Sequence, residues 1–140
     1  MTGRLWITCG AALAGLGVAA GALGAHGLKE VLSADRLHDF ETAVRYQMYH
    51  AFGLIAAGLL VGRGCPRAIR GAGTLFVLGI LLFSGGLYGW IFTEIKPLVH
   101  IVPIGGLAWI LGWISLACAA WCGPGTPQVI ETIEMPPMRH

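Results

Sequence analysis

Long stretches without a charged side chain constrain this chain more than any other feature of its sequence. The run from Leu5 to Leu28 contains no Asp, Glu, Lys or Arg, and neither does the run from Gly71 to Thr93. A helix that crosses a bilayer needs about 20 mostly apolar residues. We therefore expect both runs to be transmembrane helices. The first run also exceeds the roughly 7–15 apolar residues of a signal-peptide core, so we expect it to be retained.

Two further spans are predicted. One begins near Pro97 or Leu98 and ends by Cys122, where a Gly/Pro-rich stretch breaks the helix. The other is the slightly short uncharged run between Arg45 and Arg63. The residues before this run extend it, because apolar side chains recur there at helical spacing. They are Leu37, Phe40, Val44 and Met48.

We therefore predict one long second helix from Ala34 to Gly62. Ser33 is its expected N-cap, since a serine oxygen can accept a hydrogen bond from an N–H in the first turn. Glu41 and Arg45 are placed as an i,i+4 ion pair. The first turns should lie amphipathically at the membrane interface.

Composition supports a lipid environment. The 140 residues are 56% hydrophobic and only 11% charged, whereas soluble domains carry about 25% charged residues. The net charge of +2 comes with no basic helix, so we expect no nucleic-acid partner. The predicted fold class is all-α: an integral membrane four-helix bundle with an amphipathic extension before the second span and an irregular tail. Residues 1–122 form the transmembrane domain, and residues 123–140 form an extended cytoplasmic tail.

The positions of Lys and Arg predict the orientation of the chain. With four spans, the N-terminus, the 63–70 loop and the tail share one side. Five arginines lie there, three of them within that one short loop, whereas the four basic residues opposite are diluted by acidic ones. Because cytoplasmic loops carry an excess of basic residues, we predict both termini in the cytoplasm and the chain in the cell inner membrane.

Small residues at four-residue spacing are expected to hold the spans together, because they let helix backbones approach closely in lipid. The pattern occurs in all four predicted spans and is compatible with packing within one chain or with other membrane-protein subunits or copies. Its glycines are Gly17, Gly21, Gly58, Gly62, Gly85, Gly89 and Gly112.

Four motifs together resemble a known family. They are the stretches Gly21–Leu28, Phe40–Ala51, Leu82–Tyr88 and Pro103–Trp113. Their order and spacing are similar to those of the domain-of-unknown-function family 423, which includes the YgdD-like bacterial inner-membrane proteins. The resemblance covers about residues 5 to 120. It implies a four-span topology and brings no established reaction. His100 and the tail after Cys122 depart from the pattern of that family.

Several polar or ionisable side chains are predicted near the helix ends on the side opposite the N-terminus. Such side chains are costly at membrane depth, so each is a candidate for a functional site. Gln47 and His50 are three residues apart on the second helix, and therefore share a face. The complete set is His26, Tyr46, Gln47, His50, Tyr88, Glu94 and His100.

Three interpretations compete for this set. The side chains lock the helices through hydrogen bonds, or they bind a quinone, a lipid headgroup or another small amphiphile. The third is a metal or haem site using His26, His50 and His100, with Glu94 as a further ligand. Imidazole suits zinc, copper and haem iron, but no HxxxH or HExxH spacing supports a metal site. We predict no metal and no cofactor, with quinone and haem as the alternatives.

No pattern in the sequence indicates catalysis. The four cysteines, Cys9, Cys65, Cys118 and Cys122, form no CxxC pair. No nucleophile with its base and no phosphate-binding loop is present. The leading hypothesis is a non-enzymatic accessory or scaffold subunit of a larger membrane complex. The alternatives are a small-molecule or metal-binding membrane protein and a small channel or transporter, for which Ser84 is the main polar candidate at mid-bilayer.

Overall fold

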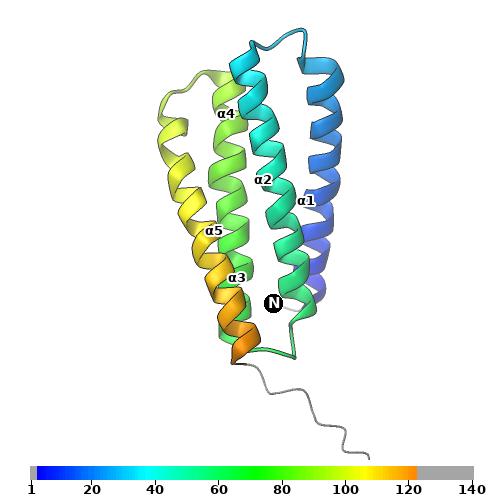
Figure 1. The fold of residues 1–140 in the computed structure, drawn as a ribbon, viewed down its shortest axis with the longest axis vertical. Coiled ribbons are helices and arrows are strands. Elements are labelled where there is room, and N and C mark those ends of the chain that lie inside the picture. Colours follow the sequence, from blue (N-terminus) through cyan, green and yellow to red (C-terminus); the bar gives the residue numbers. More distant parts are fainter. Residues whose placement is uncertain (1–2, 123–140) are drawn as a thin grey trace, which may run out of the picture.

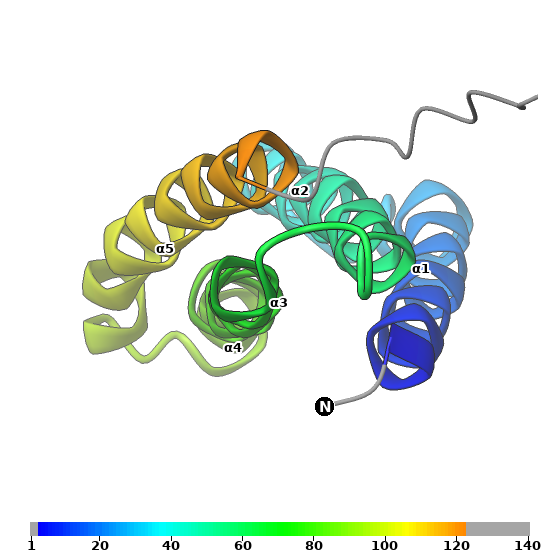
Figure 2. The same ribbon diagram turned by 90° about the horizontal axis from the view of Figure 1, so that it is seen from below.

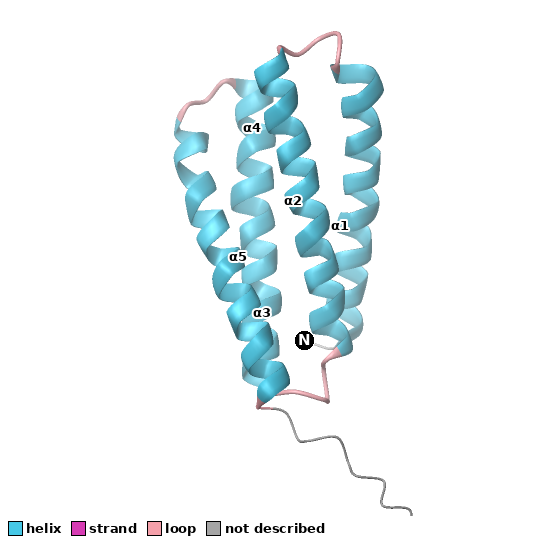
Figure 3. Cartoon of the chain, viewed as in Figure 1, coloured by secondary structure: helices cyan, strands magenta, loops and turns pink. Residues whose placement is uncertain are grey.

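The computed structural model describes residues 3–122, and every regular element among them is helical. The elements in order are α1 (Gly3–Leu23), η1 (Gly24–Leu28), α2 (Ala34–Leu59), α3 (Pro66–Gly79), η2 (Ile80–Ser84), α4 (Gly85–Thr93) and α5 (Pro97–Trp121). The π-helical turns η1 and η2 continue the α-helices that precede them, so the described residues form four continuous helices. These helices lie side by side along the long axis of the molecule (Figures 1 and 3). The all-α prediction is confirmed, and the predicted tail lies outside the described residues.

Local signals set the helix ends. The Ser33 hydroxyl accepts a hydrogen bond from the backbone N–H of Arg36 at 3.4 Å, which confirms the predicted N-cap of α2. That helix ends at Leu59, and Gly62, predicted to end it, lies in the following turn at φ +88°. Pro66 begins α3, five residues before the predicted start, because proline is well suited to a first helical turn.

Within residues 3–122, three helices are long and apolar enough to cross a membrane by length and composition. They span Gly3–Leu28, Pro66–Thr93 and Pro97–Trp121. The helix α2 is not among them, although it has 26 residues, because its first half carries charged side chains. Its predicted Glu41–Arg45 pair does not form; the ion pair within residues 3–122 joins Arg36 to Glu94 at 2.6 Å.

The helices are arranged as a curved row with a layer inside it. Figure 2 shows α1, α2 and α5 in the row, with α3 and α4 on its concave side. The most extensive pairings are α1 with α2 and α3 with α5, and α2 also packs against α3, η2 and α4. The start of α1, the α2–α3 turn and the end of α5 lie at one end of the molecule (Figure 1). The α1–α2 and α4–α5 turns lie at the other.

Phe76 of α3 forms the centre of the main core and is fully buried. Glycines on both sides make room for its ring. A Cβ atom at Gly53 of α2 would lie 3.0 Å from the ring, and one at Gly112 of α5 would lie 2.9 Å from it. Because these two positions are glycines, the Phe76 ring of α3 fits closely against both α2 and α5.

Glycines at seven-residue spacing line the side of α1 that faces α2. They are Gly3, Gly10, Gly17 and, in η1, Gly24. A Cβ atom at Gly10 would lie 2.7 Å from the Ala51 carbonyl oxygen, and one at Gly24 would lie 3.0 Å from the Phe40 ring. Since two helices keep the same faces in contact every seven residues, this heptad glycine row lets α1 and α2 stay close along their whole length.

Candidate functional site

A chain of hydrogen bonds through Gln47 links three helices. The Gln47 side-chain amide donates to the backbone carbonyl of Leu13 in α1 at 2.8 Å. The Tyr88 hydroxyl of α4 donates to the Gln47 carbonyl oxygen at 3.1 Å. Gln47 is only 5% exposed, so both bonds are made away from the surrounding solvent or lipid. Two side chains of the predicted set are therefore brought together.

Ser84 makes a second interhelical bond. Its hydroxyl, at the end of η2, donates to the backbone carbonyl of Ala43 in α2 at 2.8 Å, and its side chain is fully buried. The hydroxyl is therefore bonded to a neighbouring helix and contributes to the packing between α2 and η2.

His50 and Tyr46 lie beside Trp109 of α5, and His50 also lies near Trp113. The imidazole of His50 stacks on the Trp109 indole, with 3.8 Å between ring centroids and 2° between planes. Tyr46 stacks less closely on the same indole, at 5.6 Å. The Nδ1 atom of His50 lies 2.7 Å from the Tyr46 carbonyl oxygen. Because a carbonyl can only accept, this geometry assigns the proton to Nδ1.

These rings border a pocket of about 350 Å³ between α2, η2 and α5. We call it the aromatic groove, and its lining residues are Tyr46, His50, Phe83, Gly106, Trp109, Ile110 and Trp113. Trp109 is buried, and its indole N–H donates to the Phe76 carbonyl at 3.3 Å. Ile110 is 59% exposed and Trp113 43% exposed, so the groove opens to the outside of the molecule.

The other predicted site residues lie apart from these contacts. His26 in η1 and His100 in the first turn of α5 are exposed, and neither side chain forms a hydrogen bond within residues 3–122. Glu94 ends α4 and pairs with Arg36. Over the described part of the chain, no three His, Cys, Asp or Glu side chains gather closely enough to share a metal ion.

The predicted packing glycines occupy several environments. Gly17, Gly58, Gly89 and Gly112 are closely approached by other side chains, as judged from a Cβ placed at each. A Cβ atom at Gly21 would make an ordinary van der Waals contact with Val44. A Cβ atom at Gly85 would contact only the Ile80 carbonyl of the preceding turn. Gly62 lies in the open turn described above. The four-residue pattern therefore mixes glycines that face a neighbouring helix with glycines that do not.

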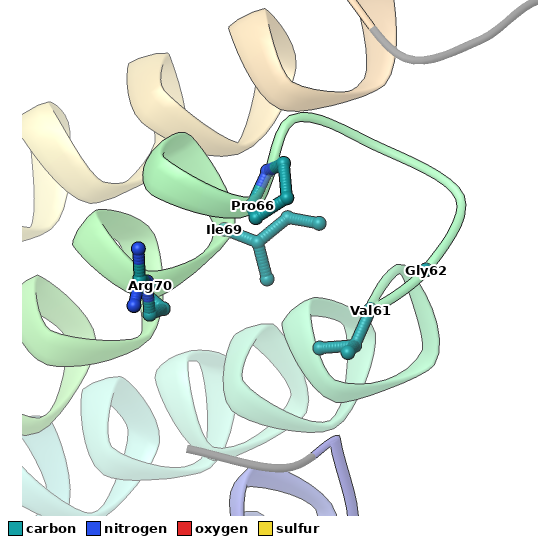
Figure 4. A pocket seen from close by; sticks show the side chains of 5 residues that line it. All are labelled: Val61, Gly62, Pro66, Ile69 and Arg70. Carbon is teal, nitrogen blue, oxygen red and sulfur yellow. The ribbon is translucent and has the colours of Figure 1, made fainter.

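The arginine-rich end contains a second pocket, of about 230 Å³, beside the α2–α3 turn. Ile69 and Pro66 of α3 lie across it from Val61, with Arg70 at its edge (Figure 4). Next to it, Cys65 precedes the first turn of α3. Hydrogen bonds from the backbone N–H groups of Ala68 and Arg67 lower the pKa of this thiol, because they stabilise its anion.

Trp109 and Trp113 are one turn apart on α5, and the sequence-based prediction did not connect them to His50. The ring contacts of the aromatic groove depend on Phe83, which η2 contributes, and on which face α5 presents to α2. A signal was nevertheless present. Gly105 and Gly106 lie one turn before Trp109, and adjacent glycines in a span let another helix approach closely; here a Cβ atom at Gly105 would lie 2.6 Å from the backbone of Phe83 in η2.

Comparison with known proteins places these features in a wider group. A family described as "Protein of unknown function (DUF423)" matches residues 20–106. The chain is 44% identical to the UPF0382 membrane protein SH2409 of Staphylococcus haemolyticus over 81% of this chain and 92% of that protein. It is 41% identical to the UPF0382 membrane protein YwdK of Bacillus subtilis over 84% of this chain and 96% of that protein. A Haemophilus influenzae UPF0382 membrane protein is 43% identical over 71% of this chain and 80% of that protein. No solved structure matches.

Proposed function

This chain belongs to the DUF423 family, whose UPF0382 relatives are membrane proteins, and we propose that it is a four-span, non-catalytic subunit that associates with other membrane helices. The observation that carries the proposal is a row of small residues on the outer face of α1. The row has no partner within the described part of the chain, whereas the glycines on the opposite face of α1 pack against α2.

The order of the helices supports four crossings. The apolar helices α1, α3–α4 and α5 are the three candidates for membrane spans. The chain leaves α1 at one end of the molecule and enters α3 at the other, and α2 is the segment between them (Figure 1). If α1 and α3–α4 cross the bilayer, α2 must cross it too. The helices would then form a four-helix bundle, with the charged first turns of α2 at the interface.

The charge distribution supports cytoplasmic termini. Arg4 lies in the first turn of α1, Arg63 in the α2–α3 turn, and Arg67 and Arg70 in the first turns of α3, so all four belong to elements at the end where α1 begins (Figure 1). At the opposite end, Arg36 is paired with Glu94, and other acidic residues accompany Lys29 and Lys96. Since basic loops stay on the cytoplasmic side, the arginine-rich end faces the cytoplasm, and the inner membrane is the expected location.

The outer face of α1 is suited to contact a further helix. Ala11, Gly15 and Ala19 are exposed and four residues apart. A Cβ atom at Gly15 would meet nothing within 4 Å, so the position is open. Small residues at this spacing favour close helix association in lipid, where burial of apolar side chains provides no driving force. The partner is another membrane subunit or a second copy of this chain.

The inward polar groups support a structural role rather than catalysis. Gln47, Tyr88 and Ser84 all make hydrogen bonds between helices. Polar groups used in this way hold helices together in the bilayer, and they leave no nucleophile paired with a base among residues 3–122.

Photocrosslinking in native membranes tests the association. A photoreactive residue replaces Leu16 on the outer face of α1 or Leu111 on the outer face of α5; both side chains are exposed. We expect one protein adduct of defined mass from position 16 only. The substitution Gly15→Leu should abolish that adduct, whereas Gly71→Leu, which also adds a side chain into open space, should not. Lipid adducts alone at both positions would refute the proposed association.

A further inference from the structure

The aromatic groove is the open side of the ring cluster between α2, η2 and α5, and its depth indicates which molecules can reach it. With a rise of about 1.5 Å per residue, His50 lies about 24 Å along α2 from Ala34 and about 14 Å from Leu59. Trp109 is the middle residue of α5. In a chain that spans a bilayer, with hydrocarbon about 30 Å thick, this level lies within the acyl chains. A ligand of the groove must therefore be soluble in lipid.

The accessible aromatic walls of the groove are Tyr46 and Trp113, which are 39% and 43% exposed, and they stand beside a buried stack of rings. Trp109 and His50 are parallel, and the Phe83 ring lies 4.7 Å from Trp109 at 42°. Aromatic rings attract other rings in offset or edge-to-face arrangements. The floor is open because Gly106 has no side chain: a Cβ atom there would approach only Phe83, and no closer than 3.9 Å. Such walls favour a flat ring over a flexible acyl chain.

One polar atom in the groove defines what the ring must carry. The Nδ1–H of His50 is bonded to the Tyr46 carbonyl. In a neutral imidazole the other nitrogen, Nε2, is then an acceptor. His50 is 5% exposed and lines the groove, and its Nε2 has no hydrogen-bond partner among residues 3–122. A ligand that pairs with it must donate a hydrogen.

We propose that the aromatic groove binds the ring of a lipid-soluble hydroquinone, with one ring hydroxyl donating to Nε2 of His50. The volume fits this ligand. A cavity of about 150 Å³ holds one benzene molecule, so the 350 Å³ measured here accommodates one or two fused rings and the start of an apolar tail. The tail leaves through the open side, past Ile110 and Trp113.

This geometry predicts a preference for the reduced form of the ring. A hydroquinone hydroxyl can donate to Nε2, whereas the carbonyl oxygen of the oxidised quinone meets a second acceptor. The Tyr46 hydroxyl can donate or accept, so it does not oppose this preference. Since the two forms have nearly the same shape, the hydrogen bond at His50 accounts for the difference. We expect hydroquinone to bind about tenfold more tightly than its quinone, the usual effect of one hydrogen bond.

Binding is measured on the full chain in nanodiscs. A short-chain naphthohydroquinone and its oxidised naphthoquinone are equilibrated with immobilised protein discs, the first under argon with excess reductant. The ligand retained beyond that on empty discs is quantified by mass spectrometry. We expect saturable retention of both forms, with the hydroquinone favoured. Equal affinity for the two forms would overturn the role of Nε2.

Two variants separate the walls of the groove from its acceptor. Gly106→Leu fills the groove and should reduce the affinity for both forms more than tenfold. His50→Phe keeps a ring against Trp109 but removes the acceptor, so it should abolish the preference while retaining the quinone. His38→Phe, the same change at an exposed position of α2, should leave both affinities unchanged.

Three further outcomes would overturn the proposal. The first is hydroquinone retention unaffected by Gly106→Leu, which would place the ligand elsewhere. The second is a preference for hydroquinone that persists in His50→Phe. The third is release of phospholipid alone from the purified protein, with no displacement of it by hydroquinone. The comparison of the two forms on the unaltered chain tests the preference even where a variant fails to fold.

Discussion

At the scale of single residues, Gln47 couples two interhelical hydrogen bonds, one to the Leu13 carbonyl and one from the Tyr88 hydroxyl. Its side-chain amide donates to one helix while its carbonyl oxygen accepts from another. An amide is one of the few side chains that can do both at once, and therefore one side chain fixes the position of α2 relative to α1 and α4.

The substitution Tyr88→Phe should lower the free energy of unfolding in detergent by about 0.5–1.5 kcal/mol, because it removes one interhelical hydrogen bond and leaves the Gln47 oxygen unpaired. Titration with a denaturing detergent measures the change. In a double-mutant cycle with Gln47→Leu, the second substitution should have little further effect. Additive losses would show that the two side chains are not coupled.

Glu94 combines an ion pair with a strained backbone. Its φ of 60° lies in the left-handed region, which residues other than glycine adopt at a cost of about 1 kcal/mol. Its partner Arg36 and Glu94 itself are both substantially exposed, so their ion pair contributes little. We expect Glu94→Gly to raise the free energy of unfolding by a few tenths of a kcal/mol or more, since glycine favours this helix end. Glu94→Ala, which loses the pair and keeps the strain, should lower it.

At the scale of helices, the sequence was sufficient to predict the elements and insufficient to predict their contacts. Uncharged runs and the cap at Ser33 are local features, and the helices follow them closely. The contact faces depend on the neighbour of each helix. Four-residue glycine spacing directed attention to Gly21, whereas the structure uses Gly10 as well as Gly17, which are seven residues apart and face α2. The aromatic groove likewise needs η2 and α5 in a register that no single segment determines.

The heptad glycine row of α1 can be tested with one pair of variants. Gly10→Leu places a side chain against the Ala51 backbone, which cannot move without moving α2, and should destabilise the fold by about 1–3 kcal/mol. Gly15→Leu on the opposite face should leave the isolated protein unchanged, because nothing lies near it. Unfolding by denaturing detergent provides the measurement. Equal effects of the two substitutions would contradict the assigned packing face.

At the scale of the whole molecule, membrane topology is open to a direct test through Cys65. In a chain with Cys9, Cys118 and Cys122 replaced by alanine, a membrane-impermeant maleimide should label Cys65 in inverted vesicles and not in intact cells. A cysteine placed at Lys29 in the same background, with Cys65 also replaced, should show the reverse. Labelling of both positions from one side would exclude a crossing by α2.

The rate of this labelling should also depend on pH in a defined direction. The N–H groups at the start of α3 lower the pKa of Cys65, so the thiolate forms at a lower pH than in an unfolded chain. We expect the labelling rate in detergent to rise at lower pH than for a free peptide of residues 61–69. The same profile for both would show that the start of α3 does not stabilise the thiolate.

The close pairing of α1 with α2 has a consequence for biosynthesis. The ribosome delivers α1 first, and this helix is apolar enough to enter the bilayer alone. The following helix, α2, is less apolar, because its first half carries charged side chains. We expect α2 to enter the membrane as a hairpin with α1, by packing against the heptad glycine row of the α1 helix already inserted in the lipid. Substitutions in the heptad glycine row should then reduce the fraction of nascent chains that insert into the membrane, in addition to destabilising the finished protein.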